Sequence, residues 1–353
     1  MGVLGDGLVL VVAFLVILVG AELFTNGIEW FGRKLELAEG AVGSVLAAVG
    51  TAMPETMIPI IAILFTGGEA ENVGIGAILG APFMLSTLAM FVTGVAVLVM
   101  GRRRPRGDVV LADARVLTHD VRYFAIAYAI AIGTAFLPET ISWLRLVVAA
   151  GLLGIYAWYV KAHFEADPDV DAEDLAPLRL HRIDRRAHRA DPAVPRLRVV
   201  SVQVAVALTC IVVGAYAFVG SIDALATSLG ADPALLALVI APIATELPEK
   251  FNSVIWVRQG KDTLALGNIT GAMVFQSTIP TVIAVVFAGA AWHVSQDSLL
   301  AFASAGITFL SMALIFLPAA RSGVLTGRRL LVGGAFYLIY LGLVLGRLSG
   351  ASI

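Results

Sequence analysis

Long apolar runs recur along nearly the whole of this 353-residue chain. A run of about 20 apolar residues is long enough to cross the hydrocarbon core of a bilayer as one helix. Hydrophobic residues make up 59% of the chain and charged residues only 14%, which is typical of proteins that reside in a membrane. The sequence therefore predicts an all-α membrane protein that crosses the bilayer many times.

We predict ten transmembrane helices, near residues 6–32, 38–65, 73–100, 121–137, 141–162, 198–226, 233–257, 263–290, 298–317 and 329–347. One long polar segment, residues 164–197, separates the fifth span from the sixth. The chain thus divides into a first half of five spans (1–163), a linker (164–197) and a second half of five spans (198–353).

The distribution of Lys and Arg predicts the orientation of the chain. Basic residues gather after every odd-numbered span, for example at 102–106, whereas the opposite loops are mostly acidic. Basic loops stay in the cytoplasm, so we expect both termini outside a plasma membrane and the linker inside. The simplest role for the arginines at 102–106 is contact with anionic lipid headgroups.

Two segments, 47–56 and 241–250, repeat one pattern inside apolar runs. The copies lie 194 positions apart, with Thr51, Pro54 and Glu55 in the first and Thr245, Pro248 and Glu249 in the second. A glutamate in the middle of a membrane helix costs about 2.5–3.5 kcal/mol or more, so it implies a partner or a ligand. A proline there frees a backbone carbonyl that can bind a cation. Paired segments of this kind point to the binding site of a transporter.

The predicted topology makes the two copies an inverted repeat, because span 2 and span 7 cross the bilayer in opposite directions. The match extends over residues 20–94 and 214–286, and it includes Gly20 with Gly214. A two-fold axis in the membrane plane would bring Glu55 and Glu249 to one site near the midplane of the bilayer.

Two carboxylates in a medium of low dielectric constant repel each other, and either a divalent cation or a bound proton relieves that repulsion. Carboxylate, hydroxyl and carbonyl oxygens favour hard cations such as Ca²⁺, Mg²⁺, Na⁺ or Mn²⁺. The motifs therefore predict a cation site, with the identity of the ion left open.

The segments 50–55, 244–249 and 267–271 resemble the repeat motifs of sodium/calcium exchangers. The resemblance implies a member of the calcium/cation antiporter superfamily with ten spans in two inverted five-helix repeats and no cofactor. It also implies alternating access, in which spans 1 and 6 slide against the other eight. By the same resemblance, the ligands of the cation would be the carboxylates of Glu55 and Glu249, the hydroxyls of Thr51 and Thr245, and the carbonyls of Ala48 and Pro242.

Several side chains of the family's sodium sites are replaced in this chain. The serine of the motif is Ala52 in one repeat and Glu246 in the other, and an Asn/Asp position is Leu85 in one and Gln276 in the other. Both Na⁺ and H⁺ therefore remain candidates for the counter-ion. Asn268 either fixes helix packing or contacts the site.

Lys250 is a further unusual residue of the second motif. Glu246 and Lys250 are four residues apart, a favourable order for an ion pair on one helix face. We hypothesise that the Lys250 ammonium acts as a tethered cation where the family would place an ion. Glu246 remains either a metal ligand or the partner of Lys250, and the Thr245 hydroxyl either a ligand or a donor to the preceding turn.

The leading hypothesis is an antiporter that exchanges a divalent cation, first of all Ca²⁺, for Na⁺ or H⁺. The alternatives on the same fold are a Mg²⁺ or Mn²⁺ transporter, a proton-coupled exchanger and a cation channel. No catalytic motif favours an enzyme, and no phosphate-binding loop is present. We expect inorganic cations and the lipid bilayer as partners, with no role for nucleic acid; monomer and homo-oligomer remain equally open.

Overall fold

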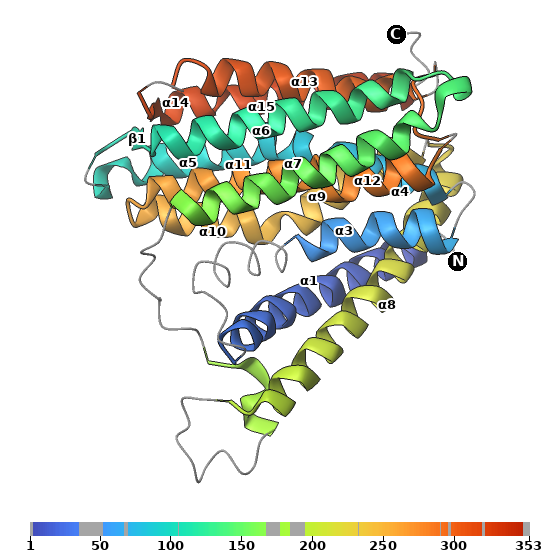
Figure 1. Cartoon of the computed structure of the whole chain (residues 1–353), viewed down its shortest axis with the longest axis horizontal. Coiled ribbons are helices and arrows are strands. Elements are labelled where there is room, and N and C mark those ends of the chain that lie inside the picture. The colour runs from blue at the N-terminus through green and yellow to red at the C-terminus, as the bar shows by residue number, and fades with distance from the viewer. Residues whose placement is uncertain are drawn as a thin grey trace.

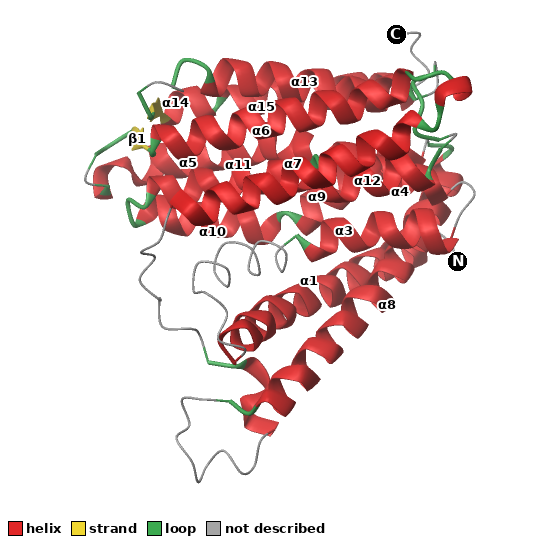
Figure 2. Cartoon of the chain, viewed as in Figure 1, coloured by secondary structure: helices red, strands yellow, loops and turns green. Residues whose placement is uncertain are grey.

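The computed structural model describes residues 3–34, 52–66, 70–104, 106–166, 177–183, 195–231, 233–289, 291–295, 298–319 and 322–348. Its first half contains α1 (Val3–Lys34), α3 (Met53–Ile60), a π-helix (Ile61–Thr66), α4 (Ala70–Met84), a second π-helix (Leu85–Ala89), α5 (Met90–Met100), β1 (Val109–Leu111), α6 (Ala114–Gly133) and α7 (Leu144–Ala166). Its second half contains α8 (Leu197–Leu229), α9 (Pro233–Thr245), α10 (Leu247–Arg258), α11 (Asp262–Gln276), α12 (Ile279–Phe287), α13 (Leu299–Phe316), β2 (Val324–Thr326), α14 (Gly327–Leu330) and α15 (Val332–Leu348). Short 3₁₀ helices occupy Gly101–Arg103, Thr134–Phe136, Glu139–Ile141 and Arg179–Ile183. The fold is that of an all-helical membrane protein, as predicted, with one very small strand pair (Figure 2).

Seven helices among the described residues are long and apolar enough to cross a membrane. The remaining predicted spans correspond to α6, to the α9–α10 pair, and to α3 with the π-helix that follows it. Helix α6 begins at Ala114, before the membrane span predicted to start near 121. The Asp113 side chain accepts a hydrogen bond from the Arg115 backbone nitrogen at 2.7 Å, and this cap favours the earlier start.

Helices α1 and α8 lie side by side and run at an angle to the rest of the bundle (Figure 1). Glycines permit their close approach. A Cβ on Gly20 would lie 2.8 Å from Ile211 Cγ1, and a Cβ on Gly214 would lie 2.7 Å from Ile17 Cγ1. The two glycines are 194 positions apart, and so are the two isoleucines. The contact is therefore two-fold symmetric, which agrees with the predicted relation between 20–94 and 214–286.

The other helices repeat this symmetry in their packing. Helix α3 packs against α12, and its counterpart α10 packs against α5. Helices α4 and α11 are also counterparts: α4 contacts α13, and α11 contacts α6. The same holds for α12 and α5, since α12 contacts α7, and α5 contacts α14 and α15. Each half thus packs its broken spans against the other half, so the cores of the two halves are continuous.

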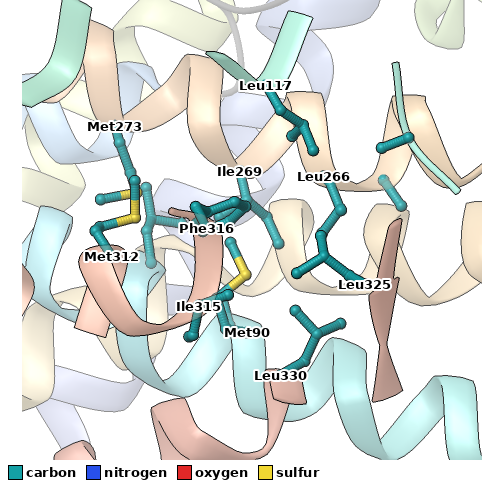
Figure 3. Packing of buried hydrophobic residues seen from close by; sticks show 14 of the residues in the cluster. Met90, Leu117, Leu266, Ile269, Met273, Met312, Ile315, Phe316, Leu325 and Leu330 are labelled. Carbon is teal, nitrogen blue, oxygen red and sulfur yellow. The ribbon is translucent and has the colours of Figure 1, made fainter. Parts of the chain in front are cut away.

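A large cluster of buried apolar side chains packs around these broken spans (Figure 3). Met90 of α5, Leu117 of α6, Met273 of α11 and Phe316 of α13 are all buried in it. Because these four residues come from both halves, the cluster joins the two repeats at one end of the bundle.

The loops that follow the predicted spans 3, 7 and 9 meet at this end, as the predicted topology requires. Strands β1 and β2, which were not predicted, pair antiparallel, and the Leu111 backbone nitrogen donates to Asp262 Oδ2 at 2.9 Å. Arg104 is buried, and its Nη2 lies 2.8 and 2.9 Å from the two carboxylate oxygens of Asp262. The expectation that Arg104 faces lipid headgroups is therefore wrong: a buried carboxylate draws this arginine into the protein. Arg102 and Arg103 are exposed.

Candidate cation-binding site

A helix begins at each of the two Pro-Glu motifs. Helix α3 begins at Met53 and α10 begins at Leu247, so the two starts are also 194 positions apart. The motif proline is the second residue of each helix and the motif glutamate the third. Proline is tolerated in the first turn because its missing N–H has no intrahelical acceptor there. A carboxylate is stabilised in the first turn by the helix dipole.

In the second half, the motif breaks the membrane span into two helices. Helix α9 ends at Thr245 and only Glu246 separates it from α10. Pro248 has no N–H to donate to the carbonyl of Ala244. The break therefore leaves backbone oxygen available within the bilayer, where a bound cation can take the place of the lost donor.

Glu55 is buried in α3, with 4% of its surface exposed. Ala52 just before the helix is also buried, and its carbonyl accepts a hydrogen bond from Thr56 Oγ1 at 2.8 Å. Helix α3 packs against α9 and α12 of the second half. The first-motif glutamate thus lies in the core, on a helix that contacts the other repeat (Figure 1).

The second motif holds a buried ion pair. Lys250 Nζ lies 3.2 Å from Glu246 Oε2, and the side chains are 6% and 0% exposed. The pairing is the one that the four-residue spacing predicts. Thr245 is buried beside it and its hydroxyl donates to the Ala241 carbonyl at 3.1 Å. This is the back-bonding alternative, and it leaves lone pairs on the hydroxyl oxygen free to accept.

Several predicted ligands fall outside the described part of the chain. Ala48 and Thr51 lie in the undescribed stretch before α3. The backbone of Pro242 and Glu249 is described within α9 and α10, but their side chains are not. A shared site between Glu55 and Glu249 therefore stays a prediction.

Hydroxyl side chains repeat one packing pattern next to the site. Ser86 and Thr87 donate to the Phe83 carbonyl at 3.0 and 2.6 Å. At the matching positions of the second half, Ser277 and Thr278 both donate to the Val274 carbonyl at 2.9 Å. These bonds stabilise the irregular backbone in the middle of spans 3 and 8, which is a packing role.

Gln276 is the clearest polar side chain that lacks a partner. It is buried at the end of α11, and neither atom of its amide has a hydrogen-bond partner among the described residues. A buried amide without a partner costs about 1–3 kcal/mol, so a ligand or water at this point would stabilise it. Asn268, two turns earlier on α11, is half-buried. At the position equivalent to Gln276, the first half has the fully buried Leu85.

No group of three His, Cys, Asp or Glu side chains that could hold a metal is present within the described ranges. The predicted donor set differs from such a group, because it combines carboxylates with hydroxyl, amide and carbonyl oxygens. Those donors suit a hard cation in transit.

Besides Asp262, the sequence analysis missed a second buried acid. Asp120 of α6 accepts hydrogen bonds from Tyr159 of α7 at 2.9 Å and from Thr270 of α11 at 2.6 Å. It connects three helices, one of which, α11, also carries Asn268 and Gln276. The only sequence signal was a single aspartate at the edge of the predicted fourth span.

Comparison with known proteins identifies a family with these features. The profile described as sodium/calcium exchanger protein matches residues 7–162 and 200–348, which include both motifs and leave out the whole linker. Inner membrane protein YrbG of Escherichia coli (strain K12) is 23% identical over 275 residues, which cover 76% of each chain.

Two solved structures share the fold. The crystal structure of the H⁺/Ca²⁺ exchanger CAX superposes with a TM-score of 0.68 at 16% identity, over 98% of this chain and 82% of that one. A structure of the sodium-calcium exchanger NCX_Mj superposes with a TM-score of 0.56 at 16% identity, over 96% of this chain and 98% of that one. At these identities the likeness shows the fold alone.

Proposed function

Because this chain belongs to the sodium/calcium exchanger family, we propose that it is a secondary active antiporter of a divalent cation. Ca²⁺ is the first candidate for the transported ion, and Na⁺ or H⁺ is the counter-ion. The ion gradient supplies the driving force, so the protein works as a transporter rather than as an enzyme and carries its ions without a cofactor.

The observation that carries the proposal is the matched position of the two helix starts. Helices α3 and α10 begin at equivalent residues of the two motifs, each with a glutamate in its first turn. If the two-fold relation seen at Gly20 and Gly214 extends through the bundle, Glu55 and Glu249 face each other across the axis. One divalent cation between them would neutralise both carboxylates.

Exchange requires the site to open alternately to the two sides of the membrane. The α1–α8 pair packs on itself through small residues and runs at an angle to the other helices (Figure 1). A pair of this kind can slide as one unit against α3 and α9, which it also contacts. In this account the halves 1–163 and 198–353 supply equivalent parts and the segment 164–197 links them. Within that segment, Leu178 is buried beside Trp30, and the Arg179 backbone nitrogen donates to Asn26 Oδ1 at 2.9 Å.

Proton coupling is the more strongly supported choice of counter-ion. Leu85 provides no oxygen where the family has Asn or Asp, and Lys250 already places a positive charge against Glu246. The first change removes an oxygen ligand for Na⁺, and the second puts a fixed positive charge where Na⁺ would bind. The two fold relatives are described as an H⁺/Ca²⁺ exchanger and a sodium-calcium exchanger, so both couplings occur on this fold.

The orientation follows from the basic loops. Arg102 and Arg103 follow α5 and Arg258 ends α10, at the end of the bundle where Arg104 pairs with Asp262, and basic segments between membrane helices stay in the cytoplasm. We place this end and the linker in the cytoplasm and both termini outside a plasma membrane.

The test is ⁴⁵Ca²⁺ uptake into proteoliposomes under an imposed Na⁺ or H⁺ gradient, with Mg²⁺ and Mn²⁺ as competitors. Antiport predicts saturable uptake that collapses when the counter-ion gradient is removed. Saturable uptake of Mn²⁺ or Mg²⁺ with no uptake of Ca²⁺ would mean that Mn²⁺ or Mg²⁺, and not Ca²⁺, is the transported ion. Flux that follows only the membrane voltage would contradict antiport and indicate a channel.

A further inference from the structure

A hollow of about 650 Å³ opens on the outer side of the bundle between α6 and α7. Its lining includes Arg115 in the first turn of α6, then Arg122 and Ile126 of the same helix, and Ile155 from α7. These α6 residues recur at spacings of seven and four, so they lie on one face of the helix. The hollow is therefore basic at one end and apolar at the other, over a rise of about 16 Å.

The basic end of the hollow lies at the end of the bundle where the basic loops meet. The Asp113 backbone nitrogen, at the start of α6, donates to Thr263 Oγ1 in the first turn of α11 at 3.0 Å. Thr263 directly follows Asp262, the partner of Arg104. Arg115 therefore lies at the end of the bundle that the basic loops assign to the headgroup layer. Arg122 lies about two helical turns further along α6, and the apolar end of the hollow lies beyond it, toward the hydrocarbon.

The surroundings of the hollow are those of a surface that faces lipid. Ile126 and Ile130 of α6 and Leu153 and Trp158 of α7 are all exposed apolar side chains. A Cβ added to Gly154 of α7 would meet nothing within 4 Å, so this part of the helix surface is open. No acidic side chain is among the described residues that line the hollow.

We propose that this hollow binds one anionic phospholipid. Its phosphate pairs with the guanidinium groups of Arg115 and Arg122, and an acyl chain lies along Ile126 and Ile155. Guanidinium groups suit phosphate because their fork of donors matches its oxygens, and basic pockets between membrane helices bind anionic headgroups. A free phosphate ion would leave the apolar end of the hollow unused, which is why the occupant is a lipid. The proposal depends on the membrane location and not on which ion is exchanged.

The hollow is connected to the core by an aromatic contact. His119, which also lines it, stacks on Tyr159 with ring centroids 5.3 Å apart. Tyr159 donates to Asp120, and Asp120 accepts a second bond from Thr270 of α11. A lipid in the hollow would therefore stabilise the junction of α6, α7 and α11, which gives the test a stability readout.

The experiment measures lipid retention by native mass spectrometry of the full chain, with phosphatidylglycerol or phosphatidylcholine added in detergent. The wild type is expected to retain one phosphatidylglycerol and to melt at a higher temperature when it is present. In the double variant Arg115→Gln/Arg122→Gln, the retained amount of phosphatidylglycerol is expected to fall by roughly tenfold or more. The increase in melting temperature should be lost as well. The matched control is Arg102→Gln/Arg103→Gln, which removes the same charge from exposed residues at the same end.

Three results would overturn the proposal. In the first, the wild type retains phosphatidylglycerol and phosphatidylcholine equally. In the second, both double variants lose phosphatidylglycerol retention to the same extent. In the third, millimolar inorganic phosphate displaces the bound lipid. The last result would identify a site for a soluble anion. None of them depends on ⁴⁵Ca²⁺ transport, so failure here is separate from failure of the proposed exchange.

Discussion

Lys250 Nζ lies 3.2 Å from Glu246 Oε2 in a part of the second motif where both side chains are buried. A buried ion pair is costly to form, and removal of one partner leaves an uncompensated charge. The lysine therefore supplies the positive charge that a buried Glu246 carboxylate would otherwise need from a mobile ion. In the proposed mechanism this fixed charge replaces one transported cation.

The first prediction concerns this lysine. In Lys250→Met, the Glu246 carboxylate needs a new positive partner, which is either a proton or Na⁺. Binding to the folded state alone raises stability with ligand concentration, so lower pH or added Na⁺ should raise the melting temperature of the variant more than that of the wild type. The double variant Lys250→Met/Glu246→Gln should lose this response. An equal response in the wild type and in Lys250→Met would refute the role of the lysine.

The second prediction restores a ligand. Leu85→Asn places an amide oxygen at the position equivalent to Gln276, where the resemblance implies a sodium ligand. We expect Na⁺ to stimulate cation uptake more strongly in this variant than in the wild type. Leu88→Asn, about one helical turn further on, is the matched control. If Na⁺ stimulated both variants alike, or neither, position 85 would not be part of the site.

The third prediction tests the symmetry of the α1–α8 contact. Gly20→Ala and Gly214→Ala each add a Cβ within 3 Å of an isoleucine, and overpacking of this kind costs about 1–3 kcal/mol. The two losses in thermal stability should be similar, because the contacts are related by the two-fold axis. Gly220→Ala on α8, where a Cβ meets nothing within 4 Å, should be neutral or stabilising by up to about 1 kcal/mol. Unequal effects of the first two would mean that the two-fold relation does not hold in the protein.

The fourth prediction concerns the contact between Arg104 and Asp262. Arg104→Met leaves the Asp262 carboxylate buried without its guanidinium, so we expect a loss of about 3–5 kcal/mol of stability. Arg103→Met, at the neighbouring exposed position, should change stability by no more than about 0.5 kcal/mol. Chemical denaturation measured on both variants distinguishes them, and equal stabilities would show that the pair contributes nothing.

Much of the fold followed from local sequence patterns. The 194-residue offset predicted that Gly20 and Gly214 are equivalent. The helix starts at Met53 and Leu247 were not predicted as such, although the motif prolines beside them carry the local signal for an interrupted helix. These features depend on hydrophobic run length and on backbone chemistry, which a sequence displays directly. The spacing of Glu246 and Lys250 likewise predicted their ion pair.

The features that were missed depend on contacts between distant segments. Arg104 appeared to be one member of a basic run at the membrane surface, but its partner Asp262 is 158 residues away. Asp120 bonds to Thr270 at a separation of 150 residues, and β1 pairs with β2 from the far end of the chain. No periodicity or local motif carries that information, because it arises only when the two halves pack together.

The most direct test of the central claim is ⁴⁵Ca²⁺ uptake by Glu55→Gln, Glu249→Gln and the double variant in proteoliposomes, with the exposed Glu22→Gln as control. If the two carboxylates hold one ion, each single variant should lose uptake by at least about 100-fold. The double variant should be little worse than either, because groups that share one ligand are not additive. Uptake at the native rate by the double variant, or losses that simply multiply, would contradict a shared site.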